Sequence, residues 1–120
     1  MNAVYWYDEP KVFEVYLMKS FSEIRAMRAK QRAEALDAAW KAIQDDLADF
    51  GVHLQRFGSS ARGKTMAHSD LDIMVLGDLD IPQKNRIDQA AARAARRFSV
   101  PYDLHFASDY TPNDLQAILS

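Results

Sequence analysis

Two aspartates stand two residues apart at the start of an apolar run, and this spacing constrains the fold more than any other feature of the sequence. Asp70 and Asp72 lead into the run 73–76, which has the composition of a buried β-strand. Successive side chains of a strand point to opposite faces, so both carboxylates are predicted to share one face. Like charges this close repel each other unless a cation neutralises them, and Mg²⁺ carried by a phosphate chain is the usual solution. The pair therefore indicates a metal site.

A second strand and a turn precede the aspartates. Residues 52–57 are predicted to form the strand, and Gly58, Ser59 and Ser60 follow it as the turn. Glycine lets the backbone come close to a ligand, while serine hydroxyls and successive free N–H groups form an anion-binding concavity. The sequence thus places a phosphate site beside the metal site. Three side chains are candidates for further phosphate contact: Ser60, Arg62 and Lys64.

These residues resemble the signature of the DNA polymerase beta superfamily of nucleotidyltransferases, in which Gly-Ser is followed, after a short spacer, by Asp-x-Asp. Gly58-Ser59 and the aspartate pair carry the signature here. The fuller form, Gly-Ser-x-Ala-Arg-Gly followed by Ser-Asp-x-Asp, is similar to the minimal nucleotidyltransferases, small proteins often encoded beside HEPN-domain partners. The resemblance covers mainly residues 51–107. Four further residues match it: Ala61, Arg62, Gly63 and Ser69.

The resemblance implies an α/β (α+β) nucleotidyltransferase-like fold, with a small mixed β-sheet packed with helices. It also implies Mg²⁺-dependent transfer of a nucleotide from a nucleoside triphosphate, AMP from ATP being the expected pair, to an acceptor hydroxyl. Gly58 and Ser59 would hold the terminal phosphates. Asp70 and Asp72 would coordinate the Mg²⁺ that the triphosphate carries and a second ion at the reacting centre, and a third carboxylate would complete the second site and help deprotonate the acceptor. The family takes a third metal-binding carboxylate from a later strand, and Asp103, within the alternating stretch 100–106, fits that role.

The same resemblance implies a partner. Minimal nucleotidyltransferases often act as antitoxins that attach AMP to a HEPN-type ribonuclease toxin, so a toxin–antitoxin role with a protein acceptor is the leading expectation. An RNA acceptor stays open, because toxins that add nucleotides to tRNA ends belong to the same superfamily. A non-catalytic antitoxin that acts by binding alone is the alternative from another class. Three converging carboxylates argue against it, since binding alone does not require them.

One rival interpretation uses the same stretch. Gly58, Gly63, Lys64 and Thr65 satisfy the P-loop pattern G-x-x-x-x-G-K-[ST]. A P-loop opens a helix of several turns, whereas only residues 66–70 separate Thr65 from the predicted strand. A strand after the aspartates favours the nucleotidyltransferase, and a helix there would favour the P-loop.

Composition bounds the remaining classes. With 120 residues, 48% of them hydrophobic, the chain is predicted to form a single domain, 1–120. A net charge of −2 argues against a protein that coats nucleic acid. The absence of cysteine excludes disulfides and thiolate metal sites and fits a reducing compartment. Because the sequence has no long apolar run and no recognisable signal peptide, we expect no membrane contact and a cytoplasmic location.

The N-terminal part, 1–50, is predicted to hold an aromatic segment at 4–7 and a long helical region from Pro10 to Phe50. We expect two helices with a break between Ser20 and Lys30, one continuous helix being the alternative. The aromatic segment is either packed on the core or a contact surface. The first apolar stripe exceeds what a small core needs, so the N-terminal helices are a candidate face for a homo-oligomer or a partner.

Beyond the predicted core, 51–107, a C-terminal helix is expected within 108–120, beginning at Thr111-Pro112. Within the core, residues 82–98 are predicted to form a third helix, whose arginines are expected on a solvated face, with phosphate or RNA contact as the alternative. His105 shares the face of Asp103 by alternation, and we expect a satisfied or exposed histidine there rather than a catalytic one.

Overall fold

Three α-helices and a three-stranded sheet make up the part of the chain that the computed structural model describes, which is the backbone of residues 10–120 and the side chains of residues 20–120. The predicted aromatic segment at 4–7 lies outside the described residues. The elements follow in the order α2 (Pro10–Asp46), β1 (His53–Phe57), η1 (Ser60–Arg62), β2 (Leu71–Leu76), α3 (Ile81–Phe98), β3 (Tyr102–Phe106), η2 (Ala107–Asp109) and α4 (Pro112–Leu119).

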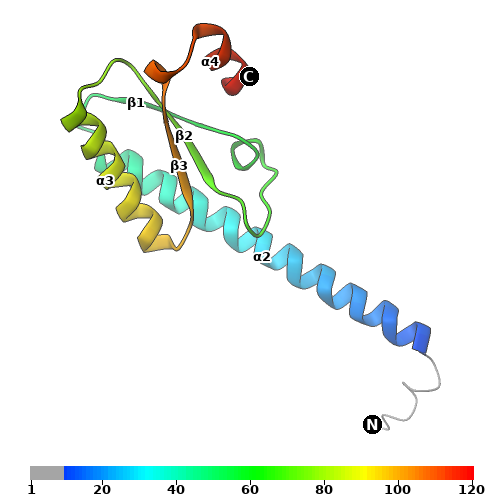
Figure 1. Ribbon diagram of the computed structural model, residues 1–120. Helices are drawn as coiled ribbons and strands as arrows, with labels where there is room; N and C mark the ends of the chain where they lie inside the picture. The colour runs from blue at the N-terminus through cyan, green and yellow to red at the C-terminus, as the bar shows by residue number, and fades with distance from the viewer. Residues whose placement is uncertain (1–9) are drawn as a thin grey trace.

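The sheet has the order β1-β2-β3, with β1 antiparallel and β3 parallel to the central strand β2 (Figure 1). The prediction of a small mixed sheet is therefore confirmed. Parallel strands cannot be joined by a tight turn, and α3 supplies the crossover from β2 to β3. In this register Asp72 lies opposite Phe57 on one side and Asp103 on the other.

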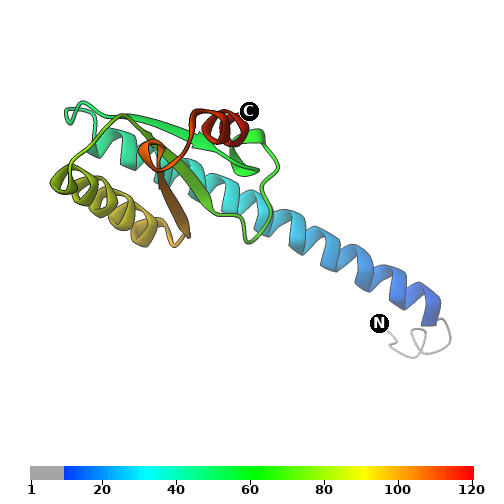
Figure 2. The same ribbon diagram turned by 45° about the horizontal axis from the view of Figure 1, so that its top comes forward.

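The core lies between the sheet and the two longer helices, which pack against each other along it (Figure 2). Every second residue of β2, namely Leu71, Ile73 and Val75, is fully buried in this core, as the alternation of a strand requires. Asp72 and Met74 therefore point to the opposite face of the sheet. The helices contribute Leu36, Ala39, Ile43 and Leu47 from α2 and Ile87, Ala90, Ala91, Ala94 and Ala95 from α3.

The predicted break in the N-terminal helical region is wrong, because α2 runs without interruption from Pro10 to Asp46. Residues 20–30 contain neither glycine nor proline and are rich in strong helix formers, so nothing in them stops a helix. The alternative of one continuous helix is the observed one. The helix also ends before Phe50, and a turn through residues 47–51 closes at Gly51, whose φ of +74° suits glycine.

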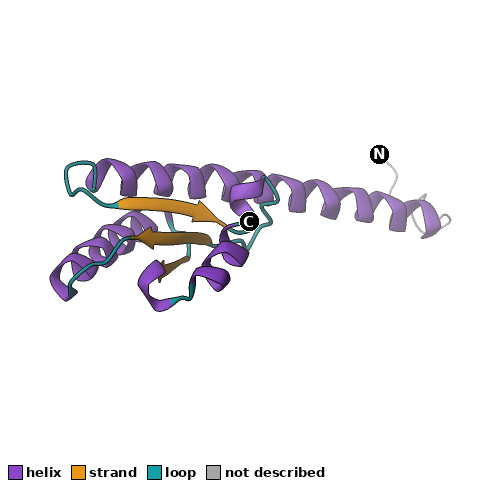
Figure 3. Cartoon of the chain, turned by 90° about the horizontal axis from the view of Figure 1, so that it is seen from above, coloured by secondary structure: helices purple, strands orange, loops and turns teal. Residues whose placement is uncertain are grey.

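The two ends of α2 differ in their surroundings. From Arg32 onward the helix lies on the domain, whereas the part before it projects away (Figures 1 and 3). Three large apolar side chains on the projecting part are exposed: Phe21 at 55%, Ile24 at 39% and Met27 at 53%. The projection gives the described chain a length of 68 Å against a width of 31 Å.

Helix caps fix the segments that flank the sheet. Asp80 and Gln83 form a reciprocal capping box at the start of α3, and Thr111 caps α4 as predicted, accepting a hydrogen bond from the N–H of Asp114 at 3.2 Å. Pro101, between α3 and β3, accepts a hydrogen bond at its carbonyl oxygen from the N–H of Leu71 at 3.0 Å. This bond aligns the starts of β2 and β3. Within the described residues, every helix is too short or too polar to span a membrane.

Candidate active site

The turn after β1 brings the backbone against an acidic side chain. Gly58 has a φ of +83°, a conformation that L side chains rarely adopt, and a Cβ placed on it would collide with the carboxylate of Asp72. Only glycine fits both constraints. The prediction that this residue allows close approach is consistent with the geometry, although the group it approaches is a carboxylate of the same chain.

After the turn comes a single short 3₁₀ helix, and this decides between the two interpretations of the stretch. The helix η1 ends at Gly63 in a left-handed conformation, and the chain then reaches β2 without any further helical residue. A P-loop needs a helix of several turns from this glycine. The P-loop interpretation is therefore excluded, and the predicted strand after the aspartates is confirmed.

Two backbone N–H groups that follow the turn share one acceptor, the carbonyl oxygen of Ser59. The N–H groups of Arg62 and Lys64 donate to the carbonyl oxygen of Ser59 at 3.1 and 2.9 Å. Between residues 20 and 120 no hydrogen bond engages the N–H groups of Ser59 and Ser60. Two adjacent free donors beside an exposed serine are the elements of an anion-binding concavity.

The predicted phosphate contacts differ in accessibility. Ser59 and Lys64 are exposed, as the prediction requires. Ser60 is only 7% exposed and its Oγ is buried without a hydrogen-bond partner, so in this conformation it cannot reach a phosphate. The side chain of Arg62 is exposed but donates from Nη2 to the carbonyl oxygen of Ser120 at 2.9 Å, which ties η1 to the end of α4.

Asp72 and Asp103 lie directly opposite each other on the parallel strands β2 and β3. His105, two residues further along β3, points to the same face, and its Nε2 lies 3.0 Å from Oδ2 of Asp103. One ligand atom from each of these three side chains lies within 4.8 Å of the others. We call Asp72, Asp103 and His105 the acidic cluster.

Asp70 is not part of this cluster. Because β2 begins at Leu71, Asp70 stands directly before the strand and is exposed, and that it shares a face with Asp72 stays a prediction. Its neighbour Ser69 is buried and fixes the segment before β2, with Oγ accepting a hydrogen bond from the N–H of Met66 at 2.8 Å. Asp70 is still close enough for its charge to act on Asp72.

The electrostatics of the cluster favour a cation. Burial raises the pKa of Asp72 above its ordinary value, the charges of Asp70 and Asp103 raise it further, and only His105 acts to lower it. Among residues 20–120, Asp72 forms no ion pair and Asp103 pairs only with His105. Two carboxylates without a lysine or arginine partner, plus one imidazole nitrogen, form a donor set that fits a divalent cation.

His105 is a satisfied histidine, as expected, since its ring nitrogens contact Tyr110 and Asp103, and its place beside Asp72 adds it to the site. The period-two alternation that places it on the face of Asp103 was visible in the sequence, so a signal existed. Tyr110 gave none. Its hydroxyl lies 2.7 Å from Nδ1 of His105, but this contact depends on η2 turning the chain back after β3.

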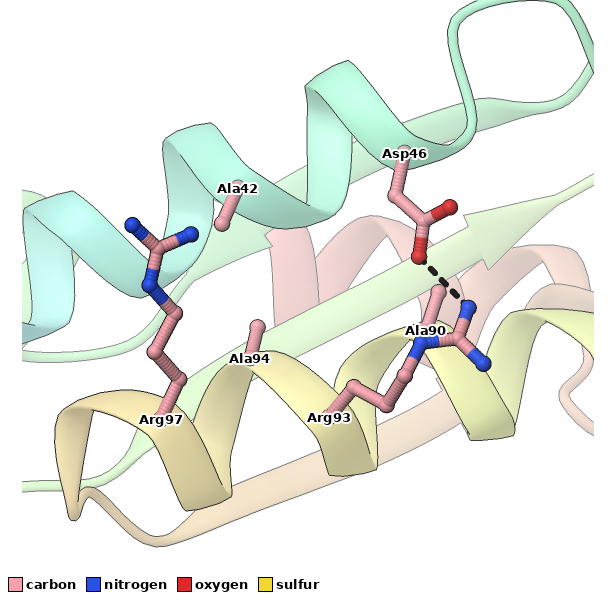
Figure 4. Close-up of a pocket in the computed structure, with 6 residues that line it drawn as sticks. All are labelled: Ala42, Asp46, Ala90, Arg93, Ala94 and Arg97. Carbon is pink, nitrogen blue, oxygen red and sulfur yellow. Dashed lines mark hydrogen bonds and ion pairs between the residues drawn. The ribbon is translucent and has the colours of Figure 1, made fainter.

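A hollow of about 360 Å³ lies between α2 and α3 (Figure 4). None of the residues of the acidic cluster lines it. In it Oδ2 of Asp46 accepts a hydrogen bond from Nη2 of Arg93 at 2.7 Å, and Oδ1 accepts one from Nη2 of Arg86 at 2.8 Å. These two arginines thus join α3 to the end of α2 rather than facing solvent alone, as had been predicted for them. Small side chains form the floor of the hollow: Ala42, Ala90 and Ala94.

Comparison with protein families gives one result. The model of the family described as "Nucleotidyltransferase domain" matches residues 36–117, which is more than half of the chain. The match begins at the packed part of α2 and includes the sheet, α3 and most of α4. Among curated proteins no match to the chain was found.

Proposed function

Because the chain belongs to the nucleotidyltransferase-domain family, we propose that it transfers a nucleoside monophosphate, AMP from ATP, to a hydroxyl of a protein acceptor. The observation that carries the proposal is the register of β2 and β3. It places Asp72 against Asp103 on the sheet face opposite the helices, beside the turn at Gly58. Nucleotidyl transfer requires a divalent cation next to a triphosphate, and these elements suit both.

In this proposal Asp72 and Asp103 hold the cation, for which the family resemblance implies Mg²⁺, and Asp70 adds negative charge that attracts it. The bound cation would neutralise charge that develops on the phosphate oxygens. Ser59 would contact the terminal phosphates with its exposed hydroxyl and the free backbone N–H, and Lys64 would add a positive charge. Gly58 keeps that turn close to the carboxylate of Asp72.

The transfer step balances as a single displacement. The acceptor oxygen forms a bond to the α-phosphorus, and the bond from that phosphorus to the bridging oxygen breaks, releasing pyrophosphate. Asp103 is the more exposed carboxylate of the cluster and is placed to accept the proton of the hydroxyl. The pairing of Asp72 with Asp103 on neighbouring strands supports this proposal, because it keeps the two carboxylates beside each other.

A protein acceptor is supported by the projecting part of α2. Phe21, Ile24 and Met27 recur every third residue along one side of the helix and are exposed. Exposed apolar side chains in a row are typical of a surface that binds another protein. We propose that this surface binds a HEPN-type toxin, and that the chain acts as the antitoxin of the pair. A second copy of the chain is the competing occupant.

The test is a transfer assay with each α-³²P-labelled nucleoside triphosphate in turn. The acceptors are the product of the neighbouring gene and, separately, tRNA. The proposal expects label from ATP on the protein, dependent on divalent metal and abolished by EDTA. Label on tRNA ends would instead identify the toxin type, and neutralisation of the partner without any label would identify an antitoxin that acts by binding.

Calorimetry gives an independent measurement. The purified chain is expected to bind ATP more tightly with Mg²⁺ than with EDTA, because the acidic cluster repels a triphosphate that carries no metal. Equal binding under both conditions would contradict the roles given to Asp72 and Asp103.

A further inference from the structure

His105 contributes the nitrogen atoms of the acidic cluster, beside the carboxylates of Asp72 and Asp103. Its Nε2 lies 3.0 Å from Oδ2 of Asp103, and one of its ring nitrogens lies within 4.8 Å of a carboxylate oxygen of Asp72. Ligand atoms that are each about 2.1 Å from one ion lie at most about 4.2 Å apart, so a cation needs at most a small shift of these side chains to bind all three. The ring nitrogen therefore lies where a ligand of the cation would lie.

The ring is held in place from its other side. Nδ1 lies 2.7 Å from the hydroxyl of Tyr110, and the ring of Phe57 meets the imidazole edge to face, with centroids 5.3 Å apart and an angle of 67°. The N–H of Tyr110 donates to the carbonyl oxygen of Ala107 at 3.1 Å, which fixes the tyrosine at the end of η2. Strands β1 and β3 and helix η2 thus set the direction of Nε2.

This arrangement matches the usual surroundings of a metal-bound histidine. Such a histidine donates its second ring N–H to an oxygen, and that hydrogen bond fixes the tautomer. If Nδ1–H donates to Tyr110, Nε2 has no proton, and its lone pair faces the two carboxylates. The alternative tautomer would have Nε2–H donate to Asp103 and would make His105 a positioning residue.

We propose that His105 is a nitrogen ligand of the catalytic cation together with Asp72 and Asp103, and that this site binds Mn²⁺ more tightly than Mg²⁺. The proposal rests on the proposed function only for the presence of a cation. Mg²⁺ strongly prefers oxygen ligands and keeps much of its water, whereas imidazole suits transition metals and carboxylates suit Mn²⁺. A set of two carboxylates and one imidazole therefore favours Mn²⁺.

Pulsed electron paramagnetic resonance of Mn²⁺ added alone to the full chain tests the ligand directly. The wild-type protein is expected to show ¹⁴N coupling, which changes to ¹⁵N coupling when the histidines are labelled with ¹⁵N. This readout needs no variant. Bound Mn²⁺ without nitrogen coupling would overturn the proposal.

Variants identify the histidine. His105→Gln is expected to lose the coupling, while His53→Gln and His68→Gln, which change the two other histidines of the chain, are expected to keep it. Both of those side chains are exposed. Coupling that survives in His105→Gln would show that another histidine binds the metal and would refute the proposal.

Titration calorimetry with Mn²⁺ and Mg²⁺ separates a ligand from a positioning residue. For His105→Gln, Mn²⁺ affinity is expected to fall about tenfold or more while Mg²⁺ affinity changes far less. An equal loss for both ions would show that His105 only orients Asp103. Tyr110→Phe keeps the ring packing and removes the hydroxyl, so it is expected to weaken Mn²⁺ binding by a smaller factor in the same direction.

The nitrogen coupling is measured without the transfer assay, so the two proposals can fail separately. Nitrogen coupling in a protein that labels no acceptor would support the assignment of His105 and count against the proposed function. Transfer with Mn²⁺ in a protein without nitrogen coupling would do the reverse. Thermal unfolding of each variant checks that the fold is intact.

Discussion

Asp46 and Asp72 are both aspartates on the central elements of the fold, but their neighbours act on them in opposite directions. Hydrogen bonds from Arg86 and then Arg93 lower the pKa of Asp46 to about 2 from its ordinary 3.8. Burial and two further acids raise the pKa of Asp72. The first carboxylate is neutralised within the chain and joins two helices. The second is left without a cationic partner, which is the state expected of a group that binds an external cation.

The comparison teaches that a carboxylate's partners indicate its role better than its burial does. Asp46 stabilises the fold as it stands, whereas Asp72 costs the fold stability that a bound ion would restore. Variants at the two positions should therefore separate activity from stability in opposite ways.

The largest effect is expected from Asp72→Asn. Losing this charge should reduce nucleotide transfer by about 10²–10³-fold, since a group that stabilises charge at the reacting centre is lost. Stability without metal should stay the same or rise, because the raised pKa shows that the folded state disfavours the charge. Transfer rate and thermal unfolding measure the two effects. A large loss of stability with unchanged transfer would reverse the comparison.

A similar loss of transfer, of about 10² or more, is expected for Asp103→Asn. ATP binding should largely survive, because Asp72 still holds the cation carried by the triphosphate. Rates at saturating ATP, with calorimetry beside them, test this split. Transfer at the wild-type rate would mean that the third carboxylate is misassigned. Asp109 or Asp114 would then be the candidates, since Asp80 is engaged as the cap of α3.

Gly58→Ala should lower both the stability of the fold and the rate of nucleotide transfer. A left-handed conformation costs a non-glycine residue about 1–2 kcal/mol, and the new methyl group would also push the carboxylate of Asp72 aside. We expect stability to fall by about that amount and transfer to fall about tenfold or more. Gly63→Ala is the matched control, since Gly63 has a φ of +73° but open space around its Cβ position. Equal transfer in the two variants would rule out the steric effect on Asp72.

Asp46→Asn should lower the free energy of unfolding by about 1 kcal/mol, because it removes two partly exposed ion pairs, one with Arg86 and one with Arg93. Transfer should be unchanged, because the ion pair lies in the helical layer. Urea unfolding and the transfer assay measure this. A strong loss of transfer in a folded Asp46→Asn protein would show that the two clusters are coupled.

The smallest effect is a dependence on pH. The folded pKa of Asp46 lies below its unfolded value, so its contribution to stability is complete above about pH 4 and disappears as the pH falls toward 2. The difference in unfolding free energy between the wild type and Asp46→Asn should shrink over that range. A difference that stays constant down to pH 2 would mean that the arginines do not act through this charge.

Sequence reasoning located most of the acidic cluster because the relevant signals are local. Alternation in β3 placed Asp103 on the polar face, and the short spacer after Gly63 argued against a P-loop helix before the structure excluded it. The first residue of β2 could not be read from the pattern, because the apolar run does not show that the hydrogen bond from Leu71 to Pro101 begins the pairing with β3. The role of Tyr110 depends on a turn that tertiary contacts set. The continuity of α2 was predictable from helix propensity, but the apolar stripes suggested two packing partners and hence two helices.

The parallel pairing of β2 with β3 also bears on the order in which the protein is made and folded. Asp72 and Asp103 meet only after the chain has completed α3 and returned to the sheet, and contacts between segments so distant in sequence form slowly. During synthesis, β1, the turn at Gly58 and β2 leave the ribosome well before the residue that completes the cluster. A nascent or truncated chain that ends before β3 therefore carries the turn, Asp70 and Asp72 but neither Asp103 nor His105. The acidic cluster is therefore complete only in a chain that has brought β3 beside β2.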